Sequence, residues 1–329
     1  MRKSYIRALP LILLLLAGKL TFAQDPHFSQ YYANPLYLNP AFAGTSMCPR
    51  LIMNFRDQWP KISGTYVTYN ASYDQHIEKI SGGIGFLLNT DRAGEGVLNT
   101  TTFSAMYSYR LEISRSFSMK AALEATYFQK HLDWEKLTFP DQINNRQGFV
   151  YNTNEVQPGT LVKRNVDFSA GVLGYGENFF AGFAVHHLTK PDEGFISLSR
   201  IPRKFTVHAG GVINLVKKIR RRHNYDSPTI SPNILFMQQQ NFQQINYGVY
   251  FNRFPFVGGI WFRQNFKNAD AFIFMAGIQA SMFKLGYSYD LTVSKLTNAT
   301  GGAHEVSFAL QFNCKPERKK ARAINCPSF

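Results

Sequence analysis

The sequence predicts an all-β fold: a transmembrane antiparallel β-barrel of about 14 strands, with an irregular N-terminal segment and a basic C-terminal tail. Three observations indicate this fold. The chain begins with an export signal, it is richer in aromatic and poorer in charged residues than a soluble protein, and apolar and polar residues alternate along most of its length. We expect a signal peptide at residues 1–23, the irregular segment at 24–50, the barrel at 51–313 and the tail at 314–329.

The export signal has the usual three parts. Basic residues precede an apolar run at residues 8–17, and a small-x-small cleavage pattern at residues 21–23 marks the expected cut. No cysteine directly follows this cut, so lipoprotein processing is not expected. No later run of about 18 apolar residues could cross a bilayer as a helix. An exported chain that is integral to a membrane must then be a closed barrel, because its strands satisfy one another's backbone hydrogen bonds.

Composition points the same way. Aromatic residues make up 15% of the chain, with 29 Phe and 17 Tyr, whereas charged residues make up 17%. Globular domains carry about 25% charged residues, which cover their surface. A barrel replaces much of that surface with a lipid-facing apolar band and aromatic girdles. The composition therefore favours a membrane barrel over a soluble secreted enzyme.

Alternation is the third observation. Between residues 284 and 293 every second residue is Leu, Tyr or Val, and the residues between them are Lys, Gly, Ser, Asp and Thr. A period of two places these two sets on opposite faces of a strand. About fourteen such runs are present, most of them as long as the roughly 9 to 11 residues that cross a bilayer when tilted. They lie near residues 51–58, 65–77, 82–91, 96–110, 115–130, 166–175, 178–188, 203–217, 228–240, 242–253, 256–267, 270–281, 282–293 and 303–313.

The more polar face of these runs would line the lumen. It carries charges of both signs, at Lys120, Glu124, Asp167, Arg263 and Asp290. This is not a ring of a single sign, the arrangement that selects ions in channels. Bulky side chains lie on the same face, at Phe128, Tyr175 and Trp261. They indicate a filled lumen, and an open pore is the alternative.

The connections between strands indicate an orientation. If the chain starts in the periplasm, connections after odd-numbered strands open outside the cell, where barrel loops tend to be long. The longest expected connections, 131–165, 189–202 and 294–302, all follow odd-numbered strands. We therefore expect an integral outer-membrane barrel with both termini in the periplasm.

Most of the positive charge lies in two clusters, one in the connection after the eighth strand and one in the tail. They consist of Lys217, Lys218, Arg220, Arg221 and Arg222, and of Lys315, Arg318, Lys319, Lys320 and Arg322. An exported chain meets little nucleic acid, so nucleic acid is not expected as a partner. The clusters are either solvated charge or docking sites for an acidic partner or for anionic lipid headgroups of the outer membrane.

No catalytic, cofactor-binding or metal-binding residues are predicted. His186 and His187 are adjacent, so on a strand they would point to opposite faces and could not act as one dyad. No Cys-x-x-Cys or paired-His spacing indicates a metal site. Cys314 and Cys326 bracket the basic tail and form the candidate disulfide, but Cys48 could instead pair with either and staple the two termini together.

The segment from Gln24 to Thr45 differs from the rest of the chain. It repeats Asn-Pro, at Asn34-Pro35 and Asn39-Pro40, among five aromatic residues. This is too much proline for a helix or a ladder strand and too many aromatic residues for a solvated linker. We expect the segment to be ordered, irregular and packed against something. It could simply cover the fold, dock a partner or close the lumen.

This segment also carries a family resemblance. It is similar to the N-terminal signature of the PorP/SprF family of outer-membrane proteins of the type IX secretion system, and the final residues 323–329 resemble the ending of many members. The residues that match the signature are Asp25, Pro26, Phe28, Ser29, Gln30, Tyr31, Asn34, Pro35, Asn39, Pro40, Ala41, Ala43 and Gly44.

The resemblance implies a non-enzymatic accessory barrel that supports secretion or surface attachment of cargo such as gliding adhesins. It implies contacts with periplasmic and outer-membrane components of the secretion machinery, and no cofactor. A barrel that conducts small solutes is the alternative. Our docking hypothesis places partner contacts at Phe28, Tyr31, Asn34, Pro35, Asn39, Pro40, Lys217, Lys218, Arg220, Arg221, Arg222, Lys319, Lys320 and Arg322.

Overall fold

The computed structural model describes residues 25–114, 116–144, 146–216, 227–266, 268–293 and 300–314. The expected signal peptide, both basic clusters of the docking hypothesis and Cys326 lie outside these residues. None of the helices described is long and apolar enough to cross a membrane.

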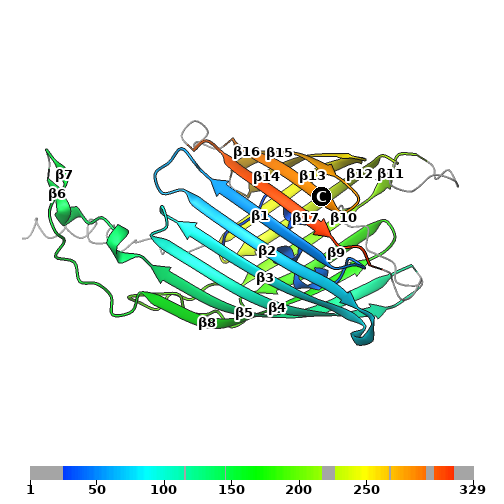
Figure 1. Ribbon diagram of the computed structural model, residues 1–329, viewed down its shortest axis with the longest axis horizontal. Helices are drawn as coiled ribbons and strands as arrows, with labels where there is room; N and C mark the ends of the chain where they lie inside the picture. The colour runs from blue at the N-terminus through cyan, green and yellow to red at the C-terminus, as the bar shows by residue number, and fades with distance from the viewer. Residues whose placement is uncertain are drawn as a thin grey trace, which may run out of the picture.

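The described residues form a closed antiparallel barrel of 14 strands (Figure 1). Successive strands pair with one another, and the pairing of the first strand with the last closes the ring. The strands are β1 (Arg50–Gln58), β2 (Tyr66–Ile77), β3 (Gly82–Ala93), β4 (Leu98–Glu112), β5 (Ser118–Leu132), β8 (Val162–Tyr175), β9 (Phe179–His186), β10 (Lys204–Gly211), β12 (Thr229–Gln239), β13 (Phe242–Arg253), β14 (Phe256–Asn265), β15 (Ala269–Gln279), β16 (Phe283–Thr292) and β17 (Ala303–Gln311).

These strands confirm the fold class and the strand count predicted from alternation. One predicted run is divided: residues 203–217 hold β10 and a short β11 (Ile213–Asn214), both paired with β12. The ladder is interrupted at Val212, whose amide donates instead to the carbonyl of Asn178, at 2.8 Å. The turn after β2 contains the 3-10 helix η3 (Glu78–Ile80), and the long connection after β5 contains η4 (Trp134–Lys136) and η5 (Pro140–Gln142).

The two faces of the strands are distributed as predicted. On β16, Tyr287 is 44% exposed on the outer surface, whereas its neighbour Ser288 is fully buried. The charged positions predicted for the lumen are all buried; they are Lys120, Glu124, Asp167, Arg263 and Asp290. Apolar side chains outside and buried charge inside are what a lipid-embedded barrel with a filled interior requires.

Antiparallel strands place alternate connections at opposite ends of the barrel. The long connections 133–161 and 187–203 share one end, which we call the loop end, and the start of β1 and the end of β17 share the other, the turn end. The first connection carries the two-stranded hairpin of β6 (Ile143–Asn144) and β7 (Gly148–Phe149), which reaches away from the barrel (Figure 1). The grouping of the long connections at one end agrees with the parity argument.

A disulfide joins Cys48 to Cys314 at the turn end. The candidate pairing of Cys314 with Cys326 is therefore wrong, and the alternative in which Cys48 staples the terminal strands together is observed. The first and last strands already meet here, since the amide of Phe312 donates to the carbonyl of Pro49 at 2.9 Å. Barrel closure brings the two cysteines together, which no local sequence pattern could show.

The N-terminal segment lies inside the barrel (Figure 1). It contains η1 (Tyr31–Ala33), α2 (Pro35–Leu38) and η2 (Pro40–Phe42). The prediction that the prolines of this segment exclude helix is therefore wrong, because Pro35 and Pro40 each start a short helical turn. Proline suits this position, since its missing N–H would have no helical partner there and its φ is already helical.

Candidate functional site: a plug in the lumen and its anchors

Residues 25–45, called the plug below, cross the lumen from one end to the other. At the loop end, the backbone amide of Asp25 donates to Gln239 Oε1, at 3.2 Å. At the turn end, the amide of Gly44 donates to Asp74 Oδ2, at 3.0 Å. Between these points the plug side chains pack against inward-facing residues of many strands. The chain thus runs through the lumen and then turns back to begin β1.

The first anchor, the rim latch, holds Asp25 at the loop end. Its carboxylate accepts from Lys204 Nζ at 2.8 Å and from Gln239 Nε2 at 3.2 Å, and lies 2.9 Å from His187 Nε2. The other ring nitrogen of His187 lies 2.6 Å from Asp167 Oδ2. The imidazole therefore links the plug to the wall strand β8.

Electrostatics keep the rim latch charged near neutral pH. Burial alone would raise the pKa of the Asp25 carboxyl, but His187 and Lys204 lower it well below its usual value. Burial would lower the pKa of the His187 imidazole, but Asp25 and Asp167 raise it to about 9. The protonated imidazole of His187 therefore lies between the carboxylates of Asp25 and Asp167.

The histidine pair departs from the expectation that adjacent residues face opposite ways. Strand β9 ends at His186, and His187 has a φ of +58°, outside the extended region. Both rings consequently reach the plug: His186 Nε2 lies 3.5 Å from the carbonyl oxygen of Leu38. The prediction that they form no catalytic dyad is unaffected, since each ring is used to hold the plug.

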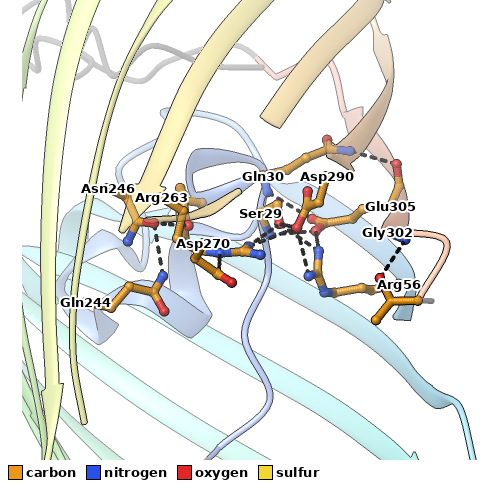
Figure 2. A network of polar contacts seen from close by, with 12 residues as sticks. Ser29, Gln30, Arg56, Gln244, Asn246, Arg263, Asp270, Asp290, Gly302 and Glu305 are labelled. Carbon is orange, nitrogen blue, oxygen red and sulfur yellow. Dashed lines mark hydrogen bonds and ion pairs between the residues drawn. The ribbon is translucent and has the colours of Figure 1, made fainter. Parts of the chain in front are cut away.

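The second anchor is a buried charge cluster around the signature residues Ser29 and Gln30 (Figure 2). Glu305 accepts from the backbone amides of Ser29 at 2.6 Å and Gln30 at 3.1 Å, and its own carbonyl accepts from Gln30 Nε2 at 2.9 Å. Ser307 donates to Gln30 Oε1 at 2.5 Å, and Arg56 pairs with Glu305 at 3.1 Å. Strand β17 therefore binds the plug backbone much as a capping carboxylate binds a helix N-terminus.

Two arginines complete the charge cluster from other strands. Arg56 of β1 and Arg263 of β14 both pair with Asp290 of β16, at 3.0 and 2.9 Å. Both also donate to Ser29 Oγ, at 2.7 and 3.2 Å, while the Ser29 hydroxyl donates to Asp290 at 2.6 Å. Figure 2 shows Ser29 at the centre of this network. Removing one partner from such a buried cluster is costly, because it leaves an uncompensated charge in the interior.

The third anchor is aromatic. The ring of Tyr31 lies 5.3 Å from that of Trp261, and Tyr32 lies 5.4 Å edge-on from Phe180. The Tyr31 hydroxyl donates to Asn246 Oδ1 at 2.6 Å. Trp261 is fully buried against the plug, so its predicted lumen-filling role is observed. Each such aromatic pair contributes about 0.5 to 1.5 kcal/mol beyond the burial of its area.

The fourth anchor seats the second Asn-Pro dipeptide on two glycines of the wall. Asn39 Nδ2 donates to the backbone carbonyl of Val172 at 3.1 Å, and its Oδ1 accepts from the Ala41 amide at 2.9 Å. A Cβ on Gly171 would lie 2.0 Å from Asn39 Oδ1, and one on Gly182 would lie 3.0 Å from Nδ2. Strands β8 and β9 thus expose their backbone where the Asn39 amide binds it.

At the turn end, the last residues of the plug also pack closely against the barrel wall. Ser108 donates to the Ala43 carbonyl at 2.7 Å, and Lys120 Nζ donates to the same oxygen. Gly44 has a φ of +61°, and a Cβ on it would lie 2.6 Å from the Cα of Gly83. The end of the family signature is therefore fixed by a glycine-to-glycine contact with β3.

The residues of the docking hypothesis are distributed unevenly. Six of them are buried inside the plug, and these are Phe28, Tyr31, Asn34, Pro35, Asn39 and Pro40. They contact the barrel's own wall, so they do not form an exposed docking surface. The basic members, Lys217, Lys218, Arg220, Arg221, Arg222, Lys319, Lys320 and Arg322, lie outside the described residues. Among the described residues there is no cluster of His, Cys, Asp and Glu that could hold a metal ion.

Sequence reasoning found only part of the wall side of the anchors, since it placed Asp290, Arg263 and Trp261 on the lumenal face but not their partners. Arg56, Glu305 and Lys204 were not singled out, although each lies at an inward position of a predicted strand. The available signal was a charged residue on the lumenal face of a barrel whose interior was expected to be filled. Pairing such residues with particular plug residues requires the three-dimensional fold.

These features define the chain as an outer-membrane β-barrel whose lumen is closed by its own N-terminal segment. Residues 20–310 match the family model described as type IX secretion system membrane protein PorP/SprF, so the chain belongs to this family. No curated protein sequence matches the chain significantly.

Two solved structures are similar to this chain. The toluene transporter TbuX of Ralstonia pickettii is 10% identical over 84% of this chain and 93% of its own, with a TM-score of 0.50. The outer membrane protein Omp33 of Acinetobacter baumannii is 8% identical over 81% of this chain and 99% of its own, with a TM-score of 0.43. At these identities the likeness concerns the barrel alone.

Proposed function

We propose that this protein is a non-enzymatic accessory component of the type IX secretion system that supports secretion or surface attachment of cargo such as adhesins. The observation that carries the proposal is the closed lumen of a chain that belongs to this secretion family. A barrel filled by an anchored plug does not pass a polypeptide. Its contribution to secretion is therefore made from its two ends, by binding other proteins.

The loop end provides the surface for cargo. Val156 in the first long connection is 86% exposed, and Ile196 and Leu198 in the second are 89% and 70% exposed. Exposed apolar side chains gathered on long connections are typical of protein contact sites. This end faces outside the cell in the orientation that the parity of the connections favours, and a surface adhesin would meet it there.

The turn end provides the surface for the secretion machinery. In the same orientation it faces the periplasm. We propose that the two basic clusters predicted from the sequence, which lie outside the described residues, act on this side. Lysine and arginine clusters there suit an acidic periplasmic partner or the anionic headgroups of the inner leaflet. The plug, in this proposal, closes the lumen and braces the barrel between these two surfaces.

A solute channel is the second candidate. The structure similar in fold at a TM-score of 0.50 is named a toluene transporter, and such a barrel could admit a small molecule. The anchored plug argues against free passage. Steady conductance of the purified protein in planar bilayers, with the plug in place, would favour this candidate.

The cargo surface is tested by a loop variant in the producing organism. We expect the double change Ile196→Ser and Leu198→Ser to lower adhesin display about tenfold, as truncation of an interface hot spot does. Ser197→Ala, an exposed change between the same two residues, is the matched control and should leave display unchanged. Heat-modifiable migration of each variant shows that the barrel is folded. Equal adhesin display by the double variant and the control would remove this connection from the proposed surface.

A further inference from the structure

A cavity of about 40 Å³ lies between one side of the plug and the barrel wall. It is bounded by plug residues such as His27 and Asn34, by Thr206 of β10 and by Gln244 of β13. The rim latch residues Asp25 and Lys204 line it toward the loop end. None of the four anchors described above occupies this space.

Three polar side chains that line the cavity lack a partner within the described part of the chain. Four polar atoms are buried without a hydrogen bond among the described residues. They are Nδ2 and Oδ1 of Asn34, the hydroxyl of Thr206 and Nε2 of His27. Asn34 and Thr206 are each only 1% exposed. Leaving such groups unsatisfied costs about 1 to 3 kcal/mol each, so several of them around one space indicate an occupant.

The two asparagines of the Asn-Pro repeat differ in whether their side chains are hydrogen-bonded. Asn39 satisfies its amide with the carbonyl of Val172 and its oxygen with the Ala41 amide. Asn34 has the same side chain one repeat earlier, makes neither kind of bond, and faces the cavity instead. The difference lies in the surroundings of Asn34 and not in its chemistry.

The lining also defines the kind of ligand. Lys204 is the cation on the wall, and its charge is already balanced by Asp25 at 2.8 Å. Phe28, Leu38 and Met237 close the remaining sides with apolar surface. A neutral molecule that both donates and accepts hydrogen bonds therefore fits. Since a water needs about 10 to 15 Å³ of such space, the cavity has room for about three waters or one small polyol.

We propose that this cavity is a binding site for neutral hydroxyl-bearing molecules, either clustered water or a polyol of glycerol size, that bridge the plug to strand β10. The plug then contacts β3, β4, β5 and β8 directly and meets β10, β12 and β13 partly across this space. Asp25 and its partners lie between that hydrated space and the loop end.

Isosteric substitution tests the site in the purified protein. The measurement is whether the thermal midpoint of unfolding falls or stays the same. Thr206→Val and Asn34→Leu keep the volume and remove the polar atoms. If these atoms bind an occupant, each variant loses those bonds and its thermal midpoint falls by about 2 °C or more. Thr206→Ser keeps the hydroxyl and should retain most of the midpoint. If these two variants are as stable as wild type, or more stable, the polar atoms of Asn34 and Thr206 bind no occupant and the proposal is wrong.

Glycerol and sucrose at equal osmolality distinguish the two sources of hydroxyl groups. Both stabilise proteins by exclusion from their surface, but sucrose is too large for this cavity. An additional midpoint rise with glycerol, present in wild type and absent in Thr206→Val, would identify a polyol site. Equal shifts with the two osmolytes, together with destabilised isosteric variants, would identify a water cluster. Both results support the site, and a high-resolution structure would place the occupant.

Discussion

The plug and the connection 133–161 are both long segments outside the barrel strands, yet they differ in burial and in the range of their polar contacts. The plug buries its aromatic residues, and its polar groups pair with wall residues far away in the chain. The connection exposes Phe149, Tyr151 and Val156, and its side-chain hydrogen bonds are local, such as Thr153 with Asp141 at 3.0 Å. The contrast teaches that aromatic content alone does not identify a binding surface, since the first segment is bound by its own barrel and the second is exposed.

The largest expected effect comes from breaking the charge cluster. Arg56→Ala leaves Asp290 and Glu305 buried with fewer partners, so we expect it to destabilise the folded protein by about 3 to 5 kcal/mol. Urea unfolding in detergent micelles measures this. Arg164→Ala, an exposed arginine on β8, is the control, and its effect should stay within about 0.5 kcal/mol. Equal stability of the two variants would show that the cluster does not anchor the plug.

A smaller effect is expected at the glycine seat of Asn39. Gly171→Ala places a methyl group where the Asn39 side chain lies, and overpacking of this kind costs about 1 to 3 kcal/mol. Gly258→Ala is the matched control, because a Cβ there meets its nearest atom, the Met275 carbonyl oxygen, at 3.8 Å. Unfolding midpoints of the two variants provide the comparison. A Gly171 variant no less stable than the Gly258 variant contradicts the seat.

The rim latch predicts a pH dependence with a definite sign. The pKa of His187 is raised in the folded state, so its contribution is complete below its unfolded pKa of about 6.5 and is lost as pH rises through about 9. The pKa of Asp25 is lowered, so its contribution is lost in acid, as pH falls below about 3.9. The thermal midpoint of wild type minus that of His187→Gln should therefore shrink between about pH 7 and pH 10. A difference that is constant or grows over this range would rule out the latch.

The smallest effect is expected in the exposed connection. Val156→Ser should change the free energy of unfolding by less than about 0.5 kcal/mol, because its side chain is 86% exposed and gains no burial on folding. Chemical denaturation measures this beside the plug variants. A destabilisation as large as that of Gly171→Ala would mean that the connection packs on the protein after all.

Much of the fold could be predicted because barrel strands carry a local signal. Alternation located every one of the 14 barrel strands, and the charge on residues such as Lys120 and Asp290 indicated the lumenal face. The Asn-Pro repeat marked the N-terminal segment as ordered, and the family signature in it was confirmed.

The anchors could not be predicted, because they join residues far apart in the sequence. Ser29 and Glu305 are 276 positions apart, and nothing local to either residue indicates the other. Separation in sequence also explains the wrong cysteine pairing. Cys326 is close to Cys314 in sequence, but closure of the barrel brings the distant Cys48 next to Cys314. The two helical turns of the plug, by contrast, could have been predicted from local sequence. Proline is favoured at the first position of a helix, and Pro35 and Pro40 occupy that position.

Conductance in planar bilayers tests most directly the claim that residues 25–45 close the lumen. The account predicts no steady conductance from the protein that retains residues 25–45. It predicts a stable ohmic channel from a variant that lacks residues 25–45 and still migrates as a heat-modifiable barrel. Steady conductance of equal size from both proteins would contradict it, because the plug would then leave an open path beside it.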